Sequence, residues 1–191
     1  MYSPVKLENI SANGSVTGRD YNDNSVHNYA NCPPQLTHIQ ILYQKYLNES
    51  LDSQKEKKEI IEDLQHFLER PSRYIEINLE HKLINSGRKY LINDAEEAKE
   101  RAVKRIMKFQ HSEVAQEIFA YTLSNILTRF RKLIVPLIKK GADIEAIDNA
   151  IFEKIINPIA SEAEPSNLGI NPYMVDAFIY FLAGNCYINW D

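Results

Sequence analysis

The sequence contains few of the residues on which several familiar classes of protein depend. Its 191 residues include six glycines and two cysteines. Cys32 and Cys186 stand near opposite ends of the chain, a spacing that fits neither a disulfide framework nor a structural zinc site, so a reduced cytoplasmic protein is expected. The glycines form neither a GxxxxGK nor a GxGxxG motif, which excludes a nucleotide site of a standard kind. We therefore expect no bound cofactor.

Long apolar runs and a dominant sign of charge are missing as well. The most apolar stretches, residues 118–128 and 177–190, are too short to span a bilayer, so no contact with a membrane is expected. The chain has 22 basic and 26 acidic side chains and a net charge of -4, which gives no overall positive field for nucleic acid. A hydrophobic content of 44% is nevertheless enough for a buried core, so a fibrous or wholly disordered protein is excluded.

Residues suited to catalysis or metal binding do not come together in a familiar spacing. The five histidines show no HExxH or HxH pattern, so no metal site is expected. Glu76, Glu80 and Lys82 invite comparison with a metal-dependent nuclease, but the upstream acidic residue and strand of such a site are missing. Charges on the surface of a helix are the simpler interpretation of these three residues. We expect a protein that is not an enzyme.

The first 31 residues differ in character from the rest, being rich in Asn, Gly, Ser and Asp. They predict a β meander between residues 5 and 29, with one hairpin turn at Asn13-Gly14. So small and polar a meander has little apolar area to set against backbone entropy. Residues 1–31 are therefore either an arm that pairs with another subunit, giving a homo-oligomer or a partner interface, or a disordered tail. The residues expected at such an interface are Val16, Gly18, Arg19, Asp20, Tyr21 and Val26.

Residues 36–191 have the pattern of a separate helical domain. Thr37 and Ser53 each begin a capping box, in which a hydroxyl accepts a hydrogen bond from the first turn and a side chain three residues later reaches back. The second of these boxes predicts a helix that ends at Arg70, because Pro71 follows. Ser112 is expected to cap a long apolar helix at the centre of the domain. Together these signals predict a mainly α domain of about six helices.

Prolines and one alternating segment predict where the helices in the second half of this domain begin and end. Pro136 is expected to kink or interrupt the long apolar helix, and Pro158 to close the helix after it. Pro172 opens a final helix to about residue 183. The residues at 186–190 alternate in the manner of a strand, so a short C-terminal β segment is predicted.

The helix expected over residues 94–109 has one basic face. Such a stripe can follow a phosphate backbone, which makes a nucleic-acid-binding sensor the alternative function. Acidic neighbours at 96, 97 and 100 dilute the charge, and the simpler interpretation is a solvated amphipathic helix. The residues of the possible nucleic-acid patch are Arg101, Lys104, Arg105 and Lys108.

The segments at residues 134–138, 155–159 and 179–190 resemble a known family. They are similar to the C-terminal domains of bacterial ABC-three-component systems, the wider group that includes Lamassu-like antiphage defence, and the resemblance covers residues 36–191. Ala183 and Tyr187 stand where that family has threonine and histidine. The matching residues form either a functional surface or part of the core. They are Tyr180, Leu182, Gly184, Asn185, Cys186, Ile188 and Trp190.

A second, shorter resemblance concerns the arm. Residues 14–21 resemble the glycine-arginine-aspartate repeat that precedes effector or sensor domains in bacterial conflict systems. Together the two resemblances imply an accessory chain that works with an ATPase of the SMC or ABC type and with a separate effector subunit. The expected function is a non-catalytic assembly or sensing module, with any contact to nucleic acid made through the complex.

Overall fold

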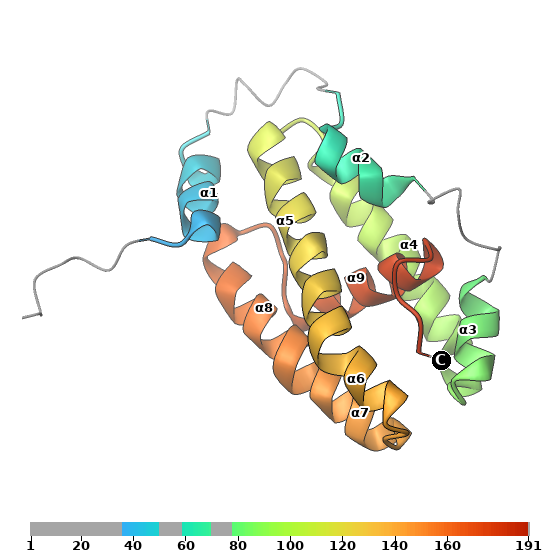
Figure 1. Cartoon of the computed structure of the whole chain (residues 1–191). Coiled ribbons are helices and arrows are strands. Elements are labelled where there is room, and N and C mark those ends of the chain that lie inside the picture. Colours follow the sequence, from blue (N-terminus) through green and yellow to red (C-terminus); the bar gives the residue numbers. More distant parts are fainter. Residues whose placement is uncertain (1–35, 50–58, 70–77, 191) are drawn as a thin grey trace, which may run out of the picture. The chain divides into compact units, whose positions relative to one another are not determined.

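The computed structural model describes residues 36–49, 59–69 and 78–190, and every regular element in these ranges is a helix (Figure 1). The prediction of a mainly α domain is confirmed, whereas the predicted β arm over residues 1–31 lies outside the described residues. The helices are α1 (His38–Leu47), α2 (Glu62–Leu68), α3 (Leu79–Asn85), α4 (Ile92–Lys108), α5 (Glu113–Arg129), α6 (Val135–Lys139), α7 (Ile144–Ile151), α8 (Asn157–Ala163) and α9 (Pro172–Gly184).

The start signals read from the sequence agree with the structure at two helices. Thr37 caps α1 in a capping box, in which its hydroxyl accepts from the Gln40 amide and the Gln40 side chain accepts from the Thr37 amide. Ser112 caps α5, where its hydroxyl oxygen lies 3.0 Å from the Ala115 amide nitrogen. These bonds satisfy amides that have no partner inside the helix, which is why both helices begin at these residues.

The two prolines change the pitch of their helices and do not break them. A π-helical turn at Phe130–Ile134 joins α5 to α6, and a second at Phe152–Ile156 joins α7 to α8. Pro136 and Pro158 follow these turns as the second residues of α6 and α8. The sequence predicts a kink or an interruption at Pro136, whereas in the structure a π turn precedes this proline and the helix continues as α6. The prediction that Pro158 closes its helix is wrong, because the wider π turn before it removes the clash.

The two joined rods run side by side, and α9 passes behind them against α4 (Figure 1). Because α6 continues α5 and α8 continues α7, the described residues form seven continuous helices, where about six were predicted. Small buried residues of α4, such as Ala98 and Ala102, allow α9 to lie close. Phe119 of α5 and Phe178 of α9 meet edge to face at 6.0 Å, so these two helices share the centre of the core. None of the described helices has the length and apolar content needed to cross a bilayer.

The C-terminal segment is irregular, so the strand predicted over residues 186–190 is wrong. The amides of Cys186 and Tyr187 bond to carbonyls in the last turn of α9, which leaves no ladder for a strand. Lys82, which the sequence pattern placed on a helix surface, is 3% exposed. Its ammonium donates to the carbonyls of Ala183 at 2.7 Å and Ile188 at 3.0 Å, and so holds this segment against the end of α9.

Candidate functional site

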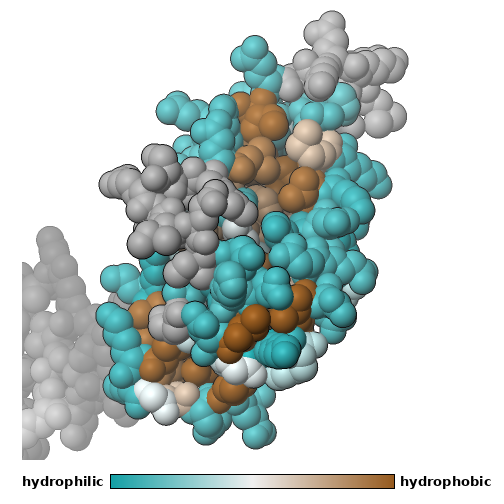
Figure 2. Space-filling model, turned by 90° about the vertical axis from the view of Figure 1, so that its right-hand side faces the viewer, coloured by the Kyte–Doolittle hydropathy of each residue, from teal (hydrophilic) through white to brown (hydrophobic). Residues whose placement is uncertain are grey.

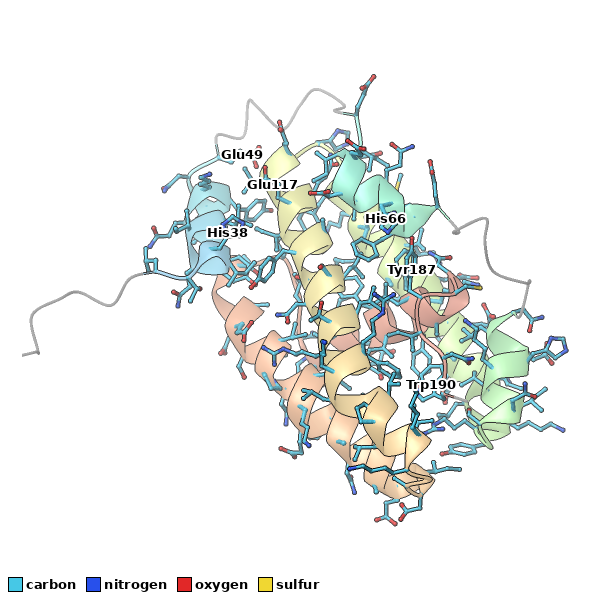
Figure 3. The ribbon with its side chains drawn as sticks, in the orientation of Figure 1. His38, Glu49, His66, Glu117, Tyr187 and Trp190 are labelled. Carbon is cyan, nitrogen blue, oxygen red and sulfur yellow. The ribbon has the colours of Figure 1, made fainter. Side chains whose placement is uncertain are left out.

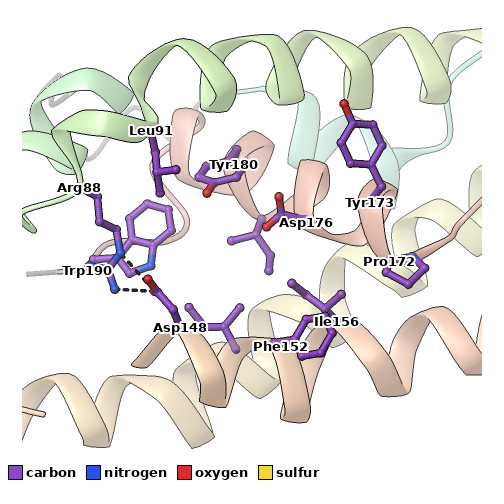
Figure 4. A pocket seen from close by; sticks show the side chains of 12 residues that line it. Arg88, Leu91, Asp148, Phe152, Ile156, Pro172, Tyr173, Asp176, Tyr180 and Trp190 are labelled. Atoms are coloured by element: carbon purple, nitrogen blue, oxygen red, sulfur yellow. Dashed lines mark hydrogen bonds and ion pairs between the residues drawn. The ribbon is translucent and has the colours of Figure 1, made fainter. Parts of the chain in front are cut away.

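A cavity of about 470 Å³ lies between the start of α4, the α7–α8 rod and α9 (Figure 4). Three elements that are far apart in sequence supply its walls, and most of the lining is apolar. This combination of an apolar wall and a few polar groups is typical of binding sites. The apolar lining residues are Leu91, Ile151, Phe152, Ile156, Pro172 and Ile179. The polar and aromatic ones are Arg88, Asp148, Tyr173, Asp176, Tyr180 and Trp190.

An ion pair closes one end of the cavity. Arg88 is 2% exposed, and its guanidinium donates twice to one Asp148 oxygen, at 2.7 and 3.2 Å (Figure 4). A third guanidinium bond goes to the Ser86 carbonyl at 3.2 Å. The same group lies 5.8 Å from the centre of the Trp190 ring. Asp148 is thus neutralised by a group of the chain itself.

Asp176 differs from Asp148 because it faces the cavity without a partner. Among the described residues no hydrogen bond or ion pair reaches its carboxylate, which lies in the middle of the site in Figure 4. Burial raises the pKa of this carboxyl from 3.8 to about 6, an effect that nearby Arg101 opposes and Asp148 adds to. Burial also raises the pKa of the neighbouring Tyr180 phenol above its usual range. The cavity therefore contains a partly buried acid on which Arg101 acts electrostatically but with which no cation among the described residues pairs directly.

The raised pKa of Asp176 predicts that Asp176→Asn stabilises the free chain. The folded pKa of about 6 exceeds the unfolded value of 3.8, so the folded state binds more protons between these pH values and its charge penalty is complete above pH 7. We expect the free energy of unfolding in urea to rise by about 1–2 kcal/mol at pH 7.5, after allowance for partial exposure. The gain should shrink toward zero as the pH falls to 4. Glu153→Gln, which removes an exposed charge, is the control and should show no such trend.

Two exposed aromatic side chains stand at the mouth of the cavity. Phe152 is 47% exposed and Tyr173 is 59% exposed, although both line the site. The Arg101 guanidinium carbon lies over the Tyr173 ring, 3.6 Å from its centre, and this contact helps to hold the ring in place. Aromatic side chains that are ordered and yet open to solvent beside a hollow are typical of protein interaction sites.

The residues of the C-terminal pattern mostly anchor the end of the chain. Asn185 donates to the Phe67 carbonyl at 3.0 Å, and the Tyr187 hydroxyl donates to the His66 carbonyl beside it (Figure 3). Both bonds tie the segment to α2. Leu182, Gly184 and Ile188 are buried, Cys186 is partly buried, and only Tyr180 and Trp190 line the cavity. In the structure, the pattern thus belongs largely to the core and only at two positions to a surface.

Trp190 connects this anchor to the candidate site. Its side chain is 5% exposed and packs edge to face on Phe130, with ring centres 6.2 Å apart, and against Tyr180 at 6.1 Å. The indole nitrogen is buried without a hydrogen-bond partner among the described residues. The last described residue of the chain also forms one wall of the cavity (Figure 4).

The basic face of α4 is present, but much of its charge is already engaged. Arg101 lies on Tyr173, Arg105 donates to the Leu168 carbonyl at 3.3 Å, and Lys104 pairs with Glu100 at 3.1 Å. Lys108 is exposed and lies 5.6 Å from the Phe109 ring. Val103 and Met107 of α4 are exposed as well. Figure 2 shows short hydrophobic strips across a mostly hydrophilic face of the molecule. This arrangement favours the solvated amphipathic helix, and nucleic-acid binding stays a prediction.

A second hollow lies between α1, α2 and α5 and is more polar. It has a volume of about 870 Å³, and His38, His66 and Glu117 are among its lining residues (Figure 3). His38 contacts the Tyr121 ring, with centres 5.9 Å apart. Within the described ranges no group of His, Cys, Asp or Glu side chains has an arrangement that could hold a metal ion. The six interface residues predicted in the arm lie outside the described residues, so the structure places none of them.

Comparison with known proteins bears on the choice between these two hollows. The sequence matches the family model for C-terminal domain 9 of the ABC-three component (ABC-3C) systems over residues 78–190. The chain belongs to this family. The match begins later than the resemblance over residues 36–191 predicted, so α1 and α2 fall outside it. No curated protein and no solved structure matches the chain.

Membership of this family favours the cavity by α9 over the polar hollow. All lining residues of the cavity lie within the matched range, whereas the polar hollow takes part of its lining from α1 and α2. A third hollow, lined by residues between 157 and 172, also lies within the match but has no aromatic residue among its described lining residues. An ABC-3C system has several components, so this domain works with other proteins. The cavity with its exposed aromatic mouth is therefore the best candidate for a functional site.

Proposed function

We propose that this chain is a non-catalytic interaction module of an antiphage ABC-3C system, and that it docks a partner subunit at the cavity beside α9. One observation carries the proposal. Phe152 and Tyr173 remain 47% and 59% exposed at the mouth of an apolar cavity, in a domain whose family works in multi-component systems. Covering such side chains on binding removes apolar area from water, which is the main source of affinity in protein interfaces.

The partners that fit this proposal are an SMC- or ABC-type ATPase and a separate effector subunit, as in Lamassu-like systems. The family match supports a place in a complex of this kind and leaves the order of assembly open to experiment. The arm at residues 1–31 has a separate proposed role, in oligomerisation or in pairing with a partner, which does not depend on the cavity.

Co-expression with the proteins encoded by neighbouring genes tests the docking site. Phe152→Ser together with Tyr173→Ser should weaken capture of the partner subunit at least about tenfold, because aromatic residues in a concave site usually contribute more than 1 kcal/mol each. Binding is measured by biolayer interferometry with the purified full chain. Circular dichroism should show unchanged helix content, since both side chains are largely exposed.

The matched control removes two exposed apolar side chains elsewhere. Ile41→Ser with Leu47→Ser changes residues of α1 that are 41% and 53% exposed, outside the cavity and outside the family match. This variant should bind the partner as the unchanged chain does. Equal affinity for all three proteins would show that the cavity is not the docking site.

A further inference from the structure

We infer that the cavity accepts a lysine or arginine side chain of the partner protein, with Asp176 as the carboxylate that pairs with it. This inference rests on the proposed docking function and adds the chemistry of the occupant. It follows from the Asp176 carboxylate, which has no direct partner among the described residues, and from the apolar walls of the cavity.

The arginines near Asp176 are engaged with other groups, so its carboxylate can pair with a cation from a ligand. Arg88, which precedes α4, is fully used by Asp148 of α7 and by the Ser86 carbonyl. Arg101 of α4 is stacked on Tyr173 and pairs with Glu97 at 4.0 Å, so it acts on Asp176 only from a distance. A carboxylate that is partly buried and has no direct partner is costly, and a cation brought by a ligand reduces that cost.

The walls of the cavity suit the stem of a basic side chain. Lysine and arginine have an apolar stem and a charged tip, and they bury the stem where apolar surface is available. Here Phe152 and Ile156 of the α7–α8 rod lie across the cavity from Asp176 (Figure 4). Ile179 of α9 adds to the apolar lining. A volume of about 470 Å³ is ample for one such side chain and part of its backbone. An acidic side chain would instead meet two carboxylates, because Asp148 also lines the site.

The affinity of this pairing should decrease as the pH falls. A cation binds the ionised form of Asp176, so binding should weaken as that carboxyl takes up a proton, from about pH 7 downward. With a pKa of about 6, roughly a tenth of the carboxyl is ionised at pH 5, and the affinity should fall about tenfold between pH 7.5 and pH 5. The other groups that face Asp176 are Arg88, Arg101, Asp148, Tyr173 and Tyr180. Arginine and tyrosine keep their charge state in this pH range.

The test measures affinity for the captured partner subunit at pH 5, 6, 7 and 7.5. Asp176→Asn should bind at least about tenfold more weakly at pH 7.5 and should lose the pH dependence between 5 and 7. Glu153→Gln removes a carboxylate one residue from Phe152 that does not line the cavity, and it should behave as the unchanged chain. If the Phe152 and Tyr173 variant loses partner binding but Asp176→Asn binds as tightly as the unchanged chain at each pH, the inference is overturned and the docking function stands.

Competing peptides identify the side chain. The probes are acetyl-Leu-Lys-Leu-amide and its arginine, norleucine and glutamate counterparts, each added to the preformed complex. Trp190 is the single tryptophan of the chain and lines the cavity, so its fluorescence in the free chain reports on peptide binding. The lysine and arginine peptides should displace the partner at least about tenfold better than the norleucine peptide at pH 7.5. Equal displacement by lysine and norleucine peptides would mean an apolar occupant and would reject the inference.

Discussion

A chain carrying Trp190→Ala is expected to lose about 3–5 kcal/mol of stability, although the residue stands at the very end of the described chain. The indole is 5% exposed and packs on Phe130, Tyr180 and the Arg88 guanidinium. Alanine removes all of these contacts and leaves a space that the surrounding helices cannot close, because α9 and the α7–α8 rod are fixed by the rest of the core. The same space opens the wall of the cavity next to Arg88.

Thermal unfolding followed by circular dichroism measures this loss. For a protein of this size, 3 kcal/mol corresponds to a decrease in Tm of roughly 6–12 °C. Trp190→Phe is the control, because it keeps an aromatic ring against Phe130 and should cost about 1–2 kcal/mol. If Trp190→Ala unfolds within 1 kcal/mol of the unchanged chain, the C-terminal segment is not docked as described, and the cavity lacks that wall in solution.

Local signals in the sequence predict helix starts well, since each depends on neighbours within four residues. Thr37 and Ser112 cap the helices expected of them. The helix predicted from Ser53 shows where this reasoning stops. Its expected start lies outside the described residues, and Ile61, which was predicted to be helical, is extended and precedes α2. The Ile61 amide bonds to Gln116 of α5 at 2.7 Å, a contact that no local pattern contains.

The end of the chain shows how a correct burial pattern can accompany an incorrect element. Ile188 and Trp190 are buried and Asn189 is exposed between them, so the alternation read as a strand does report which side chains face the core. A strand also needs a partner for its backbone. Here the backbone is held by the last turn of α9 and by Lys82, whose burial depends on contacts about a hundred residues away in sequence.

The candidate site could be predicted only in part. Tyr180 and Trp190 belong to the C-terminal pattern, but the other lining residues come from segments that only the fold brings together. Asp176 carried a signal that was overlooked. It is the one charged residue in the apolar run of α9, and an acid in such a run is either costly or functional. Its lack of a partner, by contrast, is visible only once α4 and α7 are in place.

The second large effect is expected at Gln116, a buried polar residue of α5. It is 1% exposed, and its amide group makes three bonds: it accepts from the Ile61 amide at 2.7 Å and donates to the carbonyls of Glu59 at 3.2 Å and Gln110 at 2.9 Å. Gln116→Met keeps the volume of the side chain but leaves these backbone groups without a partner. Because a buried polar group without a partner costs about 1–3 kcal/mol, we expect a total loss of about 2–4 kcal/mol.

One of the hydrogen bonds lost in Gln116→Met lies next to α2, so the effect on α2 can be measured separately from the effect on the whole domain. Ile61 directly precedes α2, so the opening of α2 should require less free energy than the unfolding of the domain. Hydrogen exchange in Gln116→Met should therefore accelerate in Glu62–Leu68 more than in α9, and urea unfolding should give the total loss. Gln44→Met, at an exposed position of α1, is the control and should stay within about 0.5 kcal/mol of the unchanged chain. Equal acceleration of exchange in α2 and α9 would mean that Gln116 stabilises the whole core. The idea that α2 opens separately when its bond to α5 is lost would then be wrong.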